Sequence, residues 1–209
     1  GLRGVWLGVR GTPFSQTRGA KANWLIEGAL RTADKNHLYG AGGKALRLDN
    51  LFSTTRGGTH PYIRATYTTE QAFSTTPNGG SEIEVDPANR IDMVTGATFD
   101  TWADPAMGRS LRLEGRMFFG YTSPGTIPSG LLLPAVIPGT ENTAVSTAEY
   151  SSFGAGFALH FRPMRELLID AGIDLAWPTP HRLEHAYPVT TSLGSSLLSA
   201  ALEVTYFYR

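Results

Sequence analysis

Charged residues in this 209-residue chain recur at alternate positions of several otherwise apolar stretches. The residues that share this pattern are Glu27, Arg31, Arg64, Asp92, Arg112, Glu114, Arg116, His160, Arg162, Asp170, Asp174 and Glu203. Acids and bases occur in similar numbers among them, so they can pair. An unpaired charge facing a narrow interior would cost on the order of several kcal/mol, and we therefore expect an ion-pair network. A conducting pore and a catalytic site are the alternatives for the same residues.

The positions between these charges are apolar, which identifies the stretches as β-strands with two different faces. Side chains alternate between the faces of a strand, so every second residue lies on the same side. In the last stretch, one side carries Leu198, Ala200, Leu202, Val204, Tyr206 and Tyr208, and the other carries Glu203. The same segregation occurs around His160 and around Asp170. One face of each strand therefore needs an apolar surface, and the other needs water or ion partners.

The pattern predicts eight strands in a single domain that spans residues 1–209. Their expected ranges are 3–11, 21–32, 61–74, 84–101, 109–122, 149–162, 166–177 and 195–208. Most reach the roughly 9 to 11 residues that a tilted membrane strand needs, and about eight strands make the smallest common barrel. The predicted fold class is all-β, a transmembrane antiparallel up-and-down β-barrel.

The lengths of the connections favour such a barrel. Asp104–Gly108 and Pro163–Glu166 are short turns, whereas the connections after the first, third, fifth and seventh strands are long. This alternation predicts a short-turn end that also holds both termini, and a long-loop end. A long irregular connection near residues 33–60 breaks the rule. It could contain a small helix around Ala45–Phe52, an excursion from the barrel, or extra strands.

Composition excludes several classes of protein. The 18 lysines and arginines equal the 18 aspartates and glutamates, so no basic excess indicates binding to nucleic acid. The chain has no cysteine, which removes thiolate catalysis and cysteine metal sites. His181 and His185 have helical metal-ligand spacing, but the neighbouring prolines argue against a helix. We expect no metal and no cofactor. A membrane-spanning helix is not expected either, because the apolar run Gly130–Pro138 is short.

The stretches from about residue 85 to 209 resemble the small bacterial outer-membrane barrels of the OmpA, OmpX and OmpW type. Such proteins commonly end on an aromatic residue, and this chain carries Tyr206, Phe207 and Tyr208 just before Arg209. The resemblance implies a location in the outer membrane of Gram-negative bacteria and contact with outer-membrane lipid.

A long loop near residues 123–148 carries an unusual apolar load among its prolines. Its apolar residues are Ile127, Leu131, Leu132, Leu133, Val136 and Ile137. An apolar connection of this kind needs a cover. It could pack over its own barrel mouth, contact another envelope protein or dip into lipid.

We therefore expect a non-enzymatic outer-membrane barrel that anchors or binds partners in a cell-envelope assembly. A lipid-modifying hydrolase is a different possibility, because PagL-like deacylases use a histidine with a serine and a carboxylate. His160 falls on the face away from lipid, which argues against a hydrolase. A small pore is also possible, as is a soluble lipocalin-like barrel, whose apolar rows would face a ligand cavity.

Overall fold

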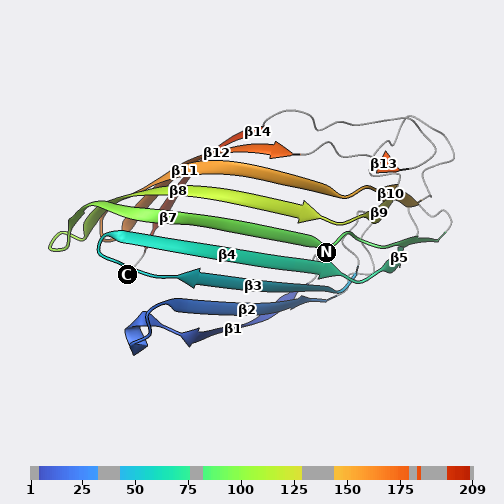
Figure 1. Ribbon diagram of the computed structural model, residues 1–209, viewed down its shortest axis with the longest axis horizontal. Coiled ribbons are helices and arrows are strands. Elements are labelled where there is room, and N and C mark those ends of the chain that lie inside the picture. Colours follow the sequence, from blue (N-terminus) through green and yellow to red (C-terminus); the bar gives the residue numbers. More distant parts are fainter. Residues whose placement is uncertain are drawn as a thin grey trace.

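The protein forms an all-β fold. The computed structural model describes residues 5–32, 43–75, 82–128, 144–178, 183–184 and 197–207. Nine of the described strands form one antiparallel sheet in which each strand pairs with the next one along the sheet (Figure 1). They are β1 (Trp6–Phe14), β2 (Asn23–Arg31), β3 (Ala45–Ser53), β4 (Thr59–Glu70), β7 (Arg90–Asp104), β8 (Arg109–Thr122), β11 (Tyr150–Met164), β12 (Leu167–Pro178) and β14 (Leu197–Tyr206). The predicted all-β, antiparallel up-and-down sheet is confirmed.

The predicted number of eight strands is wrong, because the region near 33–60 contains β3. This strand pairs with β2 from Ala45 opposite Arg31 to Ser53 opposite Asn23, and it pairs with β4 on its other edge. Of the possibilities for Ala45–Phe52, the structure contains the extra strand and not a helix. Residues 33–42 lie outside the described part of the chain.

Short turns lie at one end of the sheet, the turn end, and long connections lie at the opposite end, the loop end. At the turn end, residues 54–58, 105–108 and 165–166 link neighbouring strands. The predicted turns at Asp104–Gly108 and Pro163–Glu166 are confirmed, and Gly108 adopts a φ of 66° there. The first connection at this end is longer and contains a 3-10 turn, η1 (Gln16–Arg18).

Nine strands in place of the expected eight also change the end of the sheet at which the chain enters it relative to the end at which it leaves. Because nine strands alternate in direction, β1 begins at the loop end and β14 finishes at the turn end. The expectation that the chain both enters and leaves the sheet at the turn end is therefore wrong for β1, while residues 1–4, 208 and 209 lie outside the described part of the chain.

Small accessory sheets occupy the loop end. One consists of β5 (Phe73–Thr75) and β6 (Ile83–Val85), and the second of β9 (Gly125–Pro128), β10 (Ala144–Thr147) and β13 (Leu183–Glu184). The predicted apolar loop near 123–148 thus starts and finishes with the paired strands β9 and β10. Its middle, residues 129–143, lies outside the described part of the chain.

The main sheet has an apolar face and a polar face, and the apolar face is the more exposed. Leu7, Phe157, Ile173 and Leu202 on the apolar face are between 54% and 73% exposed. On the polar face, by contrast, Asp49 and Glu114 are 5% and 8% exposed. The sheet is twisted and curled, with β12 and β14 receding behind the strands in front (Figure 1). Among the described residues, no ladder joins β1 to β14.

Candidate functional site

The polar face is crossed by side chains that reach over glycines to strands two positions away. Tyr62 of β4 extends over Gly96 of β7 to Glu114 of β8, and its hydroxyl would lie 2.9 Å from a Cβ at Gly96. In the same way, Arg116 of β8 reaches Asp174 of β12 across β11. A Cβ on the intervening glycine of β11, Gly156, would collide with that carboxylate. The glycines thus make room for contacts between non-neighbouring strands.

Glu114 is the centre of one cluster on this face. Its carboxylate accepts hydrogen bonds from the Tyr62 hydroxyl at 2.5 Å and from Nε2 of His160 at 2.9 Å. Arg116 lies 3.5 Å away through Nη1. The nearly complete burial of this carboxylate is compatible with these partners, because each of its two oxygens then has a donor or a cation.

His160 and Arg116 connect this cluster to β12. Nδ1 of His160 lies 2.6 Å from Asp170, and Arg116 forms a two-point contact with Asp174 at 2.8 and 3.0 Å. With one ring nitrogen on each of two carboxylates, the imidazole bridges three neighbouring strands, β8, β11 and β12. The cluster therefore links β4, β8, β11 and β12 through side-chain contacts.

A second cluster covers the first four strands. Glu27 accepts hydrogen bonds from Arg10 and from Arg47, with the Arg47 contact at 3.0 Å. Asp49 pairs with Arg64, whose Nε lies 2.9 Å from the carboxylate. Arg31 pairs with Glu70, which comes from the loop end of β4.

Two smaller groups lie at opposite ends of β7. Near the loop end, Arg90 pairs with Asp92 at 2.7 Å. Near the turn end, Asp100 accepts from Arg112 at 2.7 Å and contacts His60 at 2.9 Å. The ion pairs therefore extend along the whole length of the polar face.

All the residues predicted for the ion-pair network lie on strands of the main sheet. Within the described ranges, each has an ion-pair partner except Arg162 and Glu203. Glu203 accepts a hydrogen bond from Thr205 at 3.3 Å, and the guanidinium of Arg162 lies 5.8 Å from the ring centre of Phe207.

Several members of the clusters were not predicted from the sequence. They are Arg10, Arg47, Asp49, His60, Tyr62, Glu70, Arg90 and Asp100. The alternation of Arg47 and Asp49 with Leu46 and Leu48 was a usable signal for β3. For Tyr62 there was no such signal, because its role depends on the glycine of the next strand.

Most of the predicted partner-binding residues lie outside the part of the chain that the structure describes. The backbone of Ile127 lies on β9, opposite Val145 of β10. The remaining five residues, Leu131, Leu132, Leu133, Val136 and Ile137, fall outside the described residues. Tyr208 and Arg209 do so as well.

The contacts of His160 are ionic. Both ring nitrogens of His160 contact carboxylates, so neither is available to a serine hydroxyl in this arrangement. In the described part of the chain, no group of three or more His, Asp or Glu side chains could hold a metal ion. No helix among the described residues is long and apolar enough to cross a membrane.

No protein-family model matches the chain, and no curated protein matches it significantly.

Proposed function

We propose that this chain is a membrane-embedded β-barrel of the bacterial outer-membrane type that serves as a non-enzymatic anchor in the cell envelope. The observation that carries the proposal is the exposure of the two sheet faces, which is the reverse of that in a protein folded in water: the apolar face is the more exposed and the polar face the more buried. Every strand of the main sheet has at least one large apolar side chain that is exposed, whereas buried charges lie on the polar face. In water such an apolar surface would promote aggregation, whereas in lipid it is the favourable arrangement.

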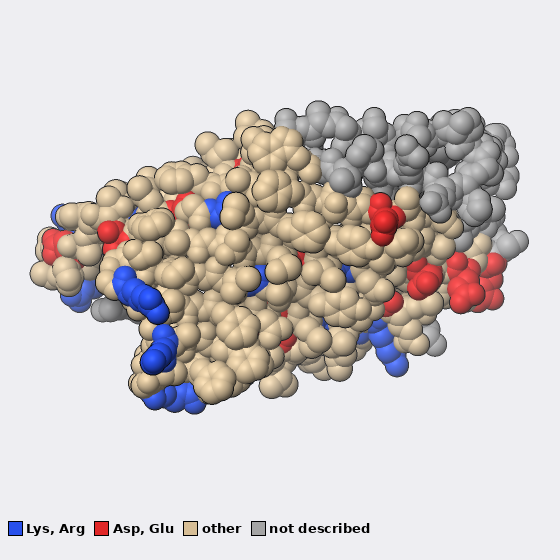
Figure 2. All heavy atoms as spheres, viewed as in Figure 1, with Lys and Arg blue, Asp and Glu red and all other residues tan. Residues whose placement is uncertain are grey.

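The distribution of charge along the strands supports the same proposal. Figure 2 shows mostly uncharged residues over the middle of the visible face, with the larger areas of lysine, arginine, aspartate and glutamate toward the two ends. The central strands β7, β8 and β11 have 15, 14 and 15 residues. A tilted strand needs roughly 9 to 11 residues to cross the hydrocarbon layer, so these strands are long enough.

The ion pairs favour anchoring over conduction. Tyr62, Arg116 and Asp174 fill the space above the glycines of β7 and β11. Side chains that fill the interior in this way leave a small barrel without a wide channel. The accessory strands at the loop end are the part of the molecule that we assign to contacts with other envelope proteins.

A ligand-binding barrel and a hydrolase have weaker support. A lipocalin-like barrel needs its apolar rows on the sheltered face, whereas here Phe157 and Ile173 are among the exposed side chains. A lipid-modifying hydrolase needs a histidine that can deprotonate a nucleophile, and His160 is engaged by two carboxylates.

Two tryptophans at the loop end allow a direct test of the proposal. Trp177 is 46% exposed on the apolar face, and Trp6, 39% exposed, lies over Arg31 and Arg47 on the polar face. Two variants would each keep one of these tryptophans and carry phenylalanine at the remaining three tryptophan positions. After refolding into vesicles of brominated phospholipid, we expect strong quenching of Trp177 and weak quenching of Trp6. Equal quenching of both, or a protein that stays in solution without vesicles, would contradict membrane insertion.

A further inference from the structure

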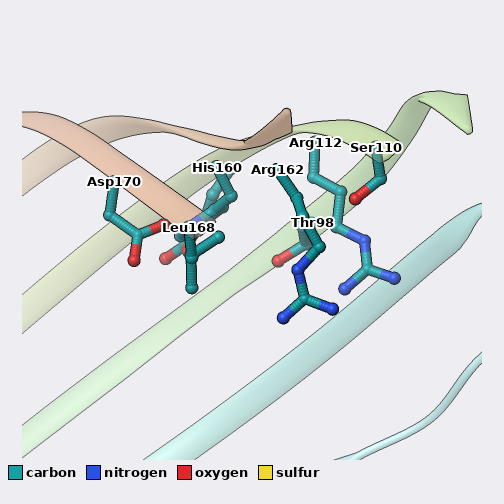
Figure 3. A pocket seen from close by; sticks show the side chains of 8 residues that line it. Thr98, Ser110, Arg112, His160, Arg162, Leu168 and Asp170 are labelled. Atoms are coloured by element: carbon teal, nitrogen blue, oxygen red, sulfur yellow. Dashed lines mark hydrogen bonds and ion pairs between the residues drawn. The ribbon is translucent and has the colours of Figure 1, made fainter. Parts of the chain in front are cut away.

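A cavity of about 350 Å³ opens on the polar face toward the turn end. Its wall includes Thr98 of β7, Ser110 and Arg112 of β8, and Arg162 of β11, with His160 and Asp170 on its opposite side (Figure 3). Arg112 and Arg162 come from paired strands, and Ser110 lies directly opposite Arg162 in the register. Two guanidinium groups and two hydroxyl groups thus line one small space.

Arg162 is the unusual member of this group. Its Nε is buried and has no hydrogen-bond partner. Nε of Arg31 and of Arg47 is also buried without a partner, but both of these arginines form ion pairs through their terminal nitrogens. Among the described residues, Arg162 has no carboxylate partner and contacts only the ring of Phe207 as a cation. The residue as a whole is half-buried, and its guanidinium lines the cavity without a carboxylate partner among the described residues, so this position favours an anion.

The carboxylates around the cavity already have partners. Asp100 holds Arg112 and His60, and Asp170 holds His160. Glu114 accepts from His160 and from Tyr62. Arg112 can therefore stay in place beside Asp100 while its remaining N–H groups face the cavity. Figure 3 shows that the Arg112 and Arg162 side chains extend from their strands in the same general direction.

We propose that this cavity binds a phosphate group between Arg112 and Arg162, with hydroxyl donors from Ser110 and Thr98. Planar guanidinium groups recognise phosphate oxygens through pairs of N–H donors, which gives both strength and geometric selectivity. Glu114 and Asp170 also line the cavity, but Tyr62 and His160 engage their carboxylates, so the guanidinium and hydroxyl groups are the ones left for a ligand. The volume admits inorganic phosphate and also a small phosphate monoester. The inference concerns the polar face alone and does not depend on insertion of the apolar face into lipid.

Calorimetric titration of the full chain in a phosphate-free, non-ionic detergent tests the proposal. Inorganic phosphate and glycerol 3-phosphate would be the two probes, at constant sodium chloride. We expect saturable binding to the wild type and a loss of affinity of about tenfold or more in Arg162→Gln, which removes one charged donor group. Tighter binding of glycerol 3-phosphate would assign the site to monoesters, and equal or weaker binding would assign it to the free ion.

Arg90→Gln is the matched control, because Arg90 also lies on the polar face but pairs with Asp92 at the opposite end of β7. We expect its phosphate affinity to equal that of the wild type. Arg162→Lys keeps the charge and loses the planar fork, so it should bind more weakly than the wild type and serves if Arg162→Gln does not fold. Heat-modifiable gel migration would report folding. Absence of binding to the wild type, or equal affinity in the Arg162 variants and Arg90→Gln, would overturn the proposal.

Discussion

At the scale of single residues, the glycines of the polar face decide which charges can meet. A carboxylate and a guanidinium on strands two positions apart are separated by a whole strand, and any side chain on that strand would stand between them. Gly156 removes this obstacle for Arg116 and Asp174, and Gly96 does so for Tyr62 and Glu114. The ion pairs therefore depend on residues that carry no charge.

Gly156→Ala should destabilise the protein by about 1–3 kcal/mol, because the new methyl group must displace the Asp174 carboxylate from Arg116. The matched control is Gly115→Ala on β8, where an added Cβ has no atom within 4 Å. It should be neutral or stabilising by about 0.4–1 kcal/mol, since alanine restricts the unfolded chain. Urea unfolding of both variants, followed by tryptophan fluorescence in detergent, measures the difference. A Gly156→Ala variant as stable as Gly115→Ala would show that the pair tolerates the methyl group.

The sequence could predict the face of each charge but not its partner. Alternation with apolar neighbours places Arg116 and Asp174 on the same face of their strands. Their contact depends on the strand order and on the register of β8, β11 and β12. In this register Gly156 of β11 lies directly opposite both Arg116 and Asp174. No local pattern contains that information, and the same limit explains why Tyr62 was not predicted.

At the scale of elements, the alternation of apolar and polar residues was sufficient to predict a strand that lies between recognisable turns. The hairpin of β11 and β12 was predicted because a short turn separates two long alternating runs. β3 remained only one of three alternatives for its region, although Leu46, Leu48 and Phe52 alternate with Arg47 and Asp49 in the same way. Glycine-rich sequence before the strand made the whole region look like one connection. A strand that follows a glycine-rich segment can be identified only with its ladder partners, which are β2 and β4 for β3.

Ile173→Arg tests the facing of a complete strand. Ile173 lies near the middle of β12 on the apolar face and is 57% exposed. If that face meets hydrocarbon, an arginine there should cost about 2–4 kcal/mol. Met107→Arg is the control, because Met107 is 55% exposed but lies in the turn between β7 and β8. Unfolding by urea from lipid vesicles compares the two. Equal, small effects would mean that water covers both positions.

At the scale of the whole molecule, the odd number of strands sets the relation between the two edges of the sheet. With nine alternating strands, β1 and β14 run in the same direction, so a direct ladder between them would be parallel. Every described residue of β1 is exposed, in keeping with a free edge. On their apolar faces the two edges are alike, since Leu7 and Val9 on β1 and Leu198 and Leu202 on β14 are all strongly exposed. Joining the edges would make that apolar surface continuous around the molecule.

This relation predicts how the edges behave in a bilayer. Unpaired N–H and C=O groups in hydrocarbon cost several kcal/mol each, so an open sheet edge is not stable there. We expect the monomeric chain in lipid vesicles to close through a parallel β1–β14 ladder. Hydrogen exchange followed by mass spectrometry should then find peptides from β1 and β14 about as protected as those from β8 at the centre of the sheet. Reconstitution at fewer than one chain per vesicle excludes pairing between copies. Fast exchange confined to β1 and β14, with β8 still protected, would mean that the sheet stays open. Lipid headgroups or water would then have to reach the polar face along the gap between β1 and β14.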